Sequence, residues 1–187
     1  SFFNVEFSSM PDYQMLYGNG FDQSFGWFFS NWGPSFDEGG PAGWGGQSSI
    51  NGFLEDYALT ISAFIRLYEA TFDEQWLDKS KHLTDYCHAH FYDSQSCMFF
   101  FTSDLDAPLI ARKMEIYDNV MPASSSVMAN NLFILGQLLN NSKYLNIAQL
   151  QLNNIKSDMS SYGSGYSNWA ILMLNYIAPF YEVAIVG

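Results

Sequence analysis

The sequence predicts a mainly α-helical protein made of helical hairpins, with one small β-hairpin and an irregular N-terminal segment. Three observations support this fold class. Apolar residues make up 48% of the 187 residues, which is enough to form a core. After residue 50 they recur every three or four positions, as on the buried face of a helix. Before residue 50, glycines and prolines interrupt every such pattern.

Residues 1–49 are predicted to form a separate irregular segment, and residues 50–187 the helical part. The segment 1–49 holds 9 of the 14 glycines and 13 of the 34 aromatic residues, and it contains no Lys or Arg. Its aromatic side chains are interpreted as a cover packed on the helical core. The alternative is a groove that stacks on sugar rings, lined by Phe25, Trp27, Phe28, Phe29 and Trp32.

The first helical hairpin is predicted over residues 53–71 and 74–91. In the first helix, apolar residues from Phe53 to Tyr68 recur at spacings of four, four, three and four. Asp73 is the predicted cap of the second helix, because its side chain can accept a hydrogen bond from the first helical turn. Only a few residues separate the two stretches, so we expect the helices to pack antiparallel.

Residues 92–121 break the helical pattern. Two short strands are predicted there, over residues 98–102 and 110–116, and residues 103–108 form the turn between them. The sequence therefore places one β-hairpin between two helical pairs.

A second helical pair follows Pro122. Its first helix is predicted to begin with Ser124 or Ser125 as the cap, and its partner spans about 143–159. Both stretches repeat apolar residues at three- and four-residue steps. We expect this pair to repeat the antiparallel packing of the first.

A fifth helix is predicted to begin at Ser167, its capping residue, and to end at Pro179. The preceding residues Gly163–Gly165 are interpreted as a hinge-like loop. Residues 182–186 are predicted to start a strand.

The charge balance argues against several classes of function. With 19 acidic and 7 basic residues, the net charge is −12, and the chain lacks the basic face that binding to nucleic acid or to an anionic membrane requires. The most apolar segment, residues 169–187, is interrupted by Asn175, Pro179 and Glu182, so no transmembrane helix is predicted. With no secretion signal expected either, we predict a cytoplasmic protein.

No metal site and no cofactor are expected. His82, His88 and His90 are spaced by six and two residues, whereas a spacing of four would place them on one helix face. Cys87 and Cys97 fit neither a redox motif nor a zinc quartet.

Several short sequence motifs after residue 49 resemble those of the YyaL and spermatogenesis-associated protein 20 family. They are FLEDYA at 53–58, LYEATFD at 67–73, Trp76-Leu77, IARKME at 110–115 and EVAIVG at 182–187, with Asp118, Pro122 and Ser126 between them. The resemblance implies part of an (α/α)6 toroid related to six-hairpin glycosidases and N-acylglucosamine 2-epimerases. It also implies a longer parent protein with a thioredoxin-like domain. A part-toroid leaves apolar helix faces uncovered, so we expect self-association or a missing remainder of the same polypeptide.

The resemblance further implies a portion that binds or acts on a small sugar, with acid–base chemistry of the glycosidase or epimerase kind. Glycoside hydrolysis needs two carboxyl groups, one as acid and one as base or nucleophile. The candidates for these catalytic roles are Asp56, Glu115 and Asp118. The candidates for ligand binding are Glu55, Tyr57, Arg112, Lys113, Ser124 and Ser126. Among them, Lys113 is expected to lower the pKa of one carboxyl group.

Structural interpretations of the same residues remain open. Glu55 and Asp56 also suit the first turn of a helix, where carboxylates compensate the helix dipole. The charged residues at 112–118 also suit a salt-bridged hairpin, and the serines after Pro122 suit ordinary helix caps. The alternative function is accordingly a non-catalytic binding or scaffold module, which supports a thioredoxin-like domain elsewhere in the parent protein.

Overall fold

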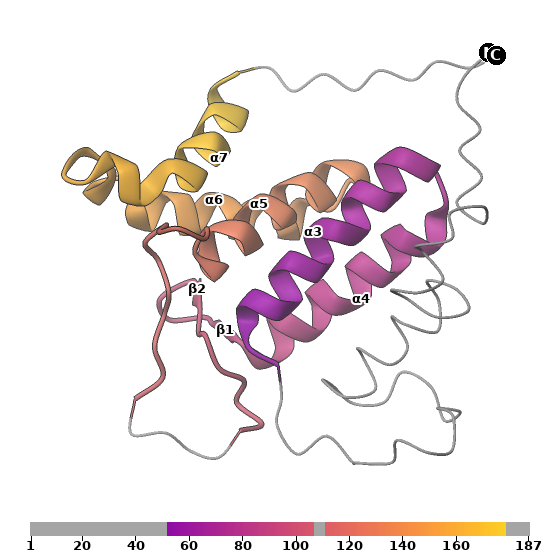
Figure 1. Cartoon of the computed structure of the whole chain (residues 1–187), viewed down its shortest axis with the longest axis horizontal. Helices are drawn as coiled ribbons and strands as arrows, with labels where there is room; N and C mark the ends of the chain where they lie inside the picture. Colours follow the sequence, from indigo (N-terminus) through magenta and orange to yellow (C-terminus); the bar gives the residue numbers. More distant parts are fainter. Residues whose placement is uncertain (1–51, 107–110, 179–187) are drawn as a thin grey trace, which may run out of the picture. The chain divides into compact units, whose positions relative to one another are not determined.

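The computed structural model describes residues 52–106 and 111–178 of the chain (Figure 1). These residues belong to the unit Gly52–Gly187. The aromatic segment 1–49 and the strand predicted at 182–186 lie outside the described residues, as does Pro179, the predicted end of the fifth helix. The described part is mainly α-helical with one small β-hairpin, as the sequence predicts.

The first helical hairpin consists of α3 (Leu54–Thr71) and α4 (Glu74–His90). Phe72 ends α3 in the left-handed backbone region, with a φ of 55°, and this reverses the chain within two residues. The side chain of Asp73 then accepts a hydrogen bond from the Gln75 amide at 3.1 Å. Both predicted helices and the predicted cap are confirmed.

The second hairpin consists of α5 (Ser124–Leu138) and α6 (Ser142–Ile155). Between them Asn140 adopts a φ of 49°, and the Asn141 side chain accepts hydrogen bonds from the first amides of α6. Gly136 allows the helices to approach, because a Cβ atom there would lie 2.7 Å from Leu145. The helix α6 ends four residues before the predicted position, and a short 3₁₀-helix covers Asp158–Ser160.

The fifth helix, α7 (Ser167–Ile177), packs on α5. The rings of Phe133 and Tyr176 meet edge to face, with centroids 4.9 Å apart. Trp169 is fully buried, and its indole Nε1 donates a hydrogen bond to the carbonyl of Ile116 at 2.9 Å. The loop predicted at 163–165 is instead a 3₁₀-helix, Gly163–Tyr166, in which Gly165 lies beneath the Tyr162 ring, so that a Cβ atom would collide with the ring.

The β-hairpin pairs β1 (Tyr92–Asp93) with β2 (Met98–Phe99). The prediction that residues 98–102 pair with a strand at 110–116 is therefore wrong for the described residues. The connection from Asp93 to Met98 is short, and the Asp93 carboxylate closes it by accepting hydrogen bonds from the amides of Gln95 and Ser96. A short loop costs less entropy to close than a longer one. Residues 111–116 form no strand, although the Lys113 carbonyl accepts one bond from the Phe101 amide.

The core lies between α3 and α5, which run side by side in Figure 1. A buried polar contact links the two helices within this apolar layer: Asn131 donates to the Ala58 carbonyl and accepts from the Ser62 hydroxyl, both at 2.7 Å. The fully buried apolar side chains of these two helices include Leu54, Ile61, Met128, Leu132 and Leu135. Among the described residues, none of the helices has the length and apolar character needed to cross a membrane.

Candidate functional site

Hydrogen bonds link the starts of three helices, α3, α5 and α7, to one another through the segments between them. The first amide of α3, from Leu54, donates to the carbonyl of Phe101 at 2.9 Å. The first turn of α5 contacts the same segment, because the Ser125 hydroxyl lies 3.5 Å from the Phe99 carbonyl oxygen. The starts of α5 and α7 are joined by one carboxylate, that of Asp118.

Asp118 is a buried carboxylate that caps two helices at once. Its Oδ1 atom accepts hydrogen bonds from the Ala123 amide at 2.9 Å and from the Ser126 hydroxyl at 2.6 Å. Its Oδ2 atom accepts from the Asn168 amide at 2.7 Å. The side chain is 6% exposed. In this arrangement Asp118 satisfies helix amides that would otherwise lack partners, which is a structural role at the position where the sequence suggests an acid–base group.

The residue that caps α5 differs from the predicted one. The N-cap is Ala123, which has no side-chain cap, and neither Ser124 nor Ser125 takes that position. The capping acceptors come from Asp118 and from Glu115, whose Oε2 atom accepts from the Ser124 amide at 3.1 Å. The same holds for α7, because its N-cap is Tyr166 and not Ser167. Carboxylates from outside the helices thus replace the local serine caps that the sequence suggests.

The serines of α5 differ in how their hydroxyl groups are used. The Ser126 hydroxyl contacts Asp118 and also accepts from the Asn168 side-chain amide at 3.1 Å. The Ser124 side chain is buried, with 1% exposure, and its hydroxyl has no hydrogen-bond partner. A buried hydroxyl without a partner costs free energy, so within the described residues Ser124 carries a buried polar group that destabilises the fold.

At the start of α3, the charge of Glu115 acts on Glu55, and we name Glu55, Asp56 and Glu115 the acidic trio. Asp56 Oδ2 accepts a hydrogen bond from the Phe53 amide at 2.8 Å, one half of a capping box. Burial raises the pKa of Asp56 above its ordinary value. The pKa of Glu55 is also raised, chiefly by burial and further by the charges of Asp56 and Glu115. The charges of Asp56 and Glu115 therefore both disfavour the charged form of Glu55.

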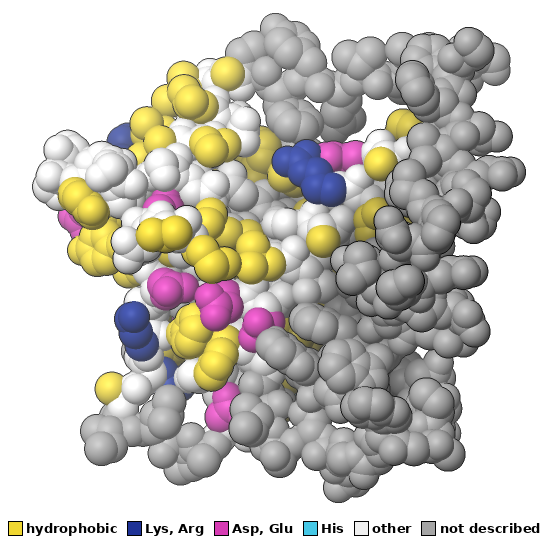
Figure 2. All heavy atoms as spheres, viewed as in Figure 1, with side chains coloured by type: hydrophobic (Ala, Val, Ile, Leu, Met, Phe, Trp, Pro, Cys, Tyr) yellow, Lys and Arg dark blue, Asp and Glu magenta, His cyan; other side chains and the backbone are white. Residues whose placement is uncertain are grey.

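Lys113 is not among the charges that shift the pKa values of Glu55 and Asp56. Lys113 is exposed, and the pKa values of Glu55 and Asp56 are raised. Among the described residues, none of the acidic trio forms a salt bridge. Figure 2 shows acidic side chains gathered, with hydrophobic ones among them, in the region where α3 begins in Figure 1.

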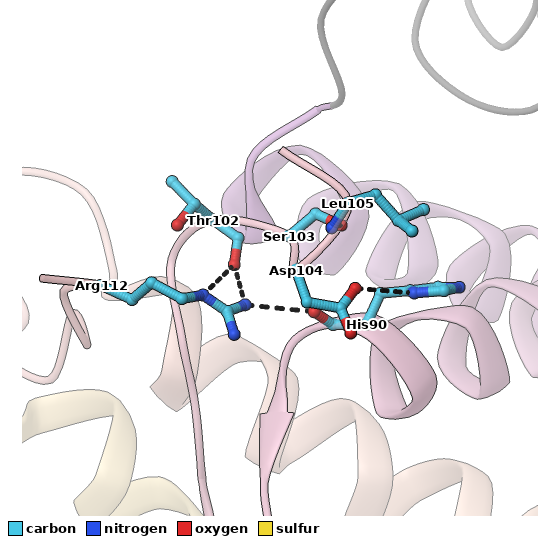
Figure 3. Close-up of polar contacts among 6 residues, drawn as sticks. All are labelled: His90, Thr102, Ser103, Asp104, Leu105 and Arg112. Carbon is cyan, nitrogen blue, oxygen red and sulfur yellow. Dashed lines mark hydrogen bonds and ion pairs between the residues drawn. The ribbon is translucent and has the colours of Figure 1, made fainter. Parts of the chain in front are cut away.

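Arg112 serves an internal contact in the structure (Figure 3). Its guanidinium group donates to the carbonyl of Thr102, from Nε at 3.1 Å, and to the carbonyl of His90 at 3.1 Å. The same group lies over the Phe100 ring, 4.2 Å from its centroid. Arg112 therefore links the end of α4 to the segment after β2. Two of its guanidinium nitrogens donate hydrogen bonds to main-chain carbonyls there.

His90 and Tyr57 also take part in packing near this end. The Nδ1 atom of His90 lies 2.9 Å from an oxygen of Asp104 (Figure 3). The His90 ring also packs on that of Tyr86. Tyr57 is 6% exposed, with its ring centroid 5.2 Å from that of Tyr86 and 5.5 Å from that of Phe91. Burial raises the pKa of Tyr57, so its hydroxyl stays protonated. Of the described residues, no group of three or more His, Cys, Asp or Glu side chains could hold a metal ion.

One residue of this end was missed by sequence reasoning. Phe53 is 41% exposed, and its ring stacks on that of Phe101 with centroids 4.8 Å apart. The periodic pattern assigns Phe53 to the buried helix face, yet it is the N-cap residue and lies outside the helix. The signal that could have identified it is its place directly before two acidic residues, because acidic pairs mark the first helical turn.

Comparisons with known proteins relate this chain to one group of relatives. It is 38% identical to spermatogenesis-associated protein 20 of Homo sapiens over 85 residues, and 35% identical to the protein of that name from Rattus norvegicus over 85 residues. It is 28% identical over 99 residues to an uncharacterised protein of Caenorhabditis elegans. These matches include 45%, 45% and 53% of the chain. The chain spans only 11% to 13% of the length of these relatives. No family model matches the chain.

Proposed function

We propose that the acidic trio and its surroundings bind a small carbohydrate, in a chain that is similar over 85 residues to spermatogenesis-associated protein 20. The observation that carries this proposal is the charge of Glu115 acting on Glu55, at the start of a helix whose N-cap residue, Phe53, exposes its ring. Carboxylates accept hydrogen bonds from sugar hydroxyl groups, and an aromatic face packs against the apolar face of a sugar ring.

The proposal extends to acid–base chemistry by two of the three predicted catalytic residues. A raised pKa keeps a carboxyl group protonated at higher pH, which suits a general acid, and Asp56 has this property. Glu115, which accepts a hydrogen bond from the Ser124 amide, is the partner carboxylate. Asp118 is assigned a positioning role in this scheme, because its oxygen atoms already accept three hydrogen bonds.

Sugar titration of the full 187-residue chain, followed by NMR, tests the proposal. We expect millimolar glucose or N-acetylglucosamine to shift the signals of Phe53 and Ser124, and Glu115→Gln to weaken this binding. The matched control is Asp78→Asn, because Asp78 is an exposed acid toward the other end of α4. A chain whose spectrum is unchanged by every sugar contradicts the proposal.

A second candidate function, the non-catalytic scaffold, has its own supporting observation. Three predicted site residues, Tyr57, Arg112 and Asp118, are engaged by contacts inside the fold. In a scaffold, the same end would serve only to fix the helix starts. The two functions differ in one outcome: substitutions in the acidic trio change ligand binding in the first case, and only stability in the second.

A further inference from the structure

We propose that the outer face of α7 is the surface through which two copies of this chain associate. We define the α7 face as Ile171, Leu174 and Ile177, whose side chains are 53%, 59% and 71% exposed. Spacings of three residues place them next to one another on one side of the helix. On the opposite side, Trp169 and Leu172 are fully buried. No residue of the acidic trio belongs to this face.

The helix α7 has the composition of a buried helix. No Asp, Glu, Lys or Arg occurs between Asp158 and Glu182, although these four residue types make up 14% of the chain. The helix α5 is equally free of charge, and it packs against α3, α6 and α7. A helix without a charged face is typical of a protein interior. In α7 this composition is combined with a side that remains exposed within the described residues.

Further exposed apolar side chains lie around the start of α7. The ring of Tyr117 meets that of the N-cap residue of α7, with centroids 5.3 Å apart, and the Tyr162 ring covers Gly165. Tyr117 and Tyr162 are more than half exposed, as are Val120 and Met121. Figure 2 shows hydrophobic side chains in the region where α7 lies in Figure 1. With the α7 face, these side chains expose on the order of 900 Å², comparable to the roughly 800 Å² that each partner buries in a standard interface.

A second copy is the occupant that the charges favour. The chain has a net charge of −12, so two copies repel one another wherever their acidic surfaces meet. The α7 face brings no carboxylate to the contact. A two-fold interface uses the same patch on both copies, and an uncharged apolar patch is complementary to itself. A membrane is disfavoured as the occupant, because helices that lie on membranes carry Lys and Arg beside their apolar face, and α7 has neither.

Sedimentation velocity of the full 187-residue chain, from low micromolar to several hundred micromolar, measures the association. We expect a dimer at the upper concentrations. We also expect added salt to strengthen it, because salt screens the repulsion between two acidic chains. Leu174→Glu and Leu174→Lys should each weaken the dimer at least ~10-fold, because either charge would be buried without a partner. The matched control is Leu59→Glu, at a leucine that is 42% exposed on α3, and it should leave the dimer within about twofold of the parent.

The two opposite charges separate a contact at α7 from repulsion between whole chains. If net charge alone governed association, Leu174→Glu would weaken it and Leu174→Lys would strengthen it, and this result overturns the proposal. A dimer that both substitutions leave intact overturns it as well. So does a chain that stays monomeric at every concentration, which would leave the face to a different partner.

A milder substitution keeps the test valid if a charged variant fails to fold. Leu174→Ala removes apolar area without adding a charge, and Ala favours the helix. It should weaken the dimer roughly threefold, because less apolar surface is buried on association. Circular dichroism of each variant checks the helix content, which should match that of the parent because Leu174 is exposed in the single chain. A folded Leu174→Ala variant that dimerises as tightly as the parent contradicts the proposal.

Discussion

The start of α3 and the starts of α5 and α7 both carry carboxylates, but the two regions use them differently. Asp118 is buried, and its oxygen atoms accept from two helix amides and one hydroxyl. Glu55 has no such donors, and its pKa is raised by burial and by two neighbouring charges. The comparison shows that burial alone does not decide the state of a carboxylate. The supply of hydrogen-bond donors decides whether it stabilises the fold or stays available to a ligand.

The largest expected effect comes from removing the satisfied carboxylate. Asp118→Ala should lower the free energy of unfolding by about 2–3 kcal/mol, because two helix starts lose their acceptor and the Ser126 hydroxyl loses a partner. Urea unfolding measures the change. Asp118→Asn keeps one acceptor oxygen and should cost less, and the exposed control Asp78→Ala should change stability by under about 0.5 kcal/mol. Equal effects of the Asp118→Ala and Asp78→Ala substitutions would contradict the capping role.

Two serines on α5, one with a hydrogen-bonded hydroxyl and one without, should show a smaller difference in the free energy of unfolding. Ser126→Ala removes a hydroxyl bonded to Asp118 and should lower the free energy of unfolding by about 1 kcal/mol. Ser124→Ala removes a buried hydroxyl without a partner, so the stability should stay within about 0.5 kcal/mol or rise slightly. Thermal or urea unfolding of both variants measures the difference. A larger loss for Ser124→Ala than for Ser126→Ala would show that the hydroxyl of Ser124 is already bonded.

The smallest effect should come from neutralising Glu55. A carboxyl group whose pKa is raised in the folded state disfavours folding once it is charged, so Glu55→Gln should stabilise the protein slightly at neutral pH. The gain should shrink as the pH falls through the raised pKa of Glu55, and vanish below about pH 4.3, where the group is protonated in both states. Urea unfolding at several pH values tests the sign. A variant that is less stable than the parent at pH 7 would show that Glu55 is paired.

The helices could be predicted from the sequence, and the reason is physical. Each helix buries one face, so its apolar residues repeat every three or four positions, and the turns carry local signals such as Asp73. The β-hairpin could not be placed, because pairing depends on loop closure. The Asp93 carboxylate closes a short turn, so β2 pairs with the nearby strand β1. The segment 110–116 would have required closing a longer loop.

The contacts of the predicted site residues could not be derived from the sequence. The sequence offers Glu115 and Asp118 as catalytic candidates and Glu55 as a ligand-binding one. Their different states depend on contacts between residues far apart in the chain, such as the one from Asn168 to Asp118, which spans 50 positions. Arg112 was likewise assigned to a ligand, while the structure engages it with main-chain carbonyls. No periodicity in the sequence encodes such contacts.

The central claim is that Glu55 belongs to a carboxylate group that is open to a ligand. Carbon-13 NMR titration of the side-chain carboxyl groups tests it most directly. We predict that Glu55 titrates above its ordinary pKa, and that Glu115→Gln lowers the pKa of Glu55 because it removes a neighbouring negative charge. A Glu55 pKa at its ordinary value, unchanged by Glu115→Gln, would contradict the claim.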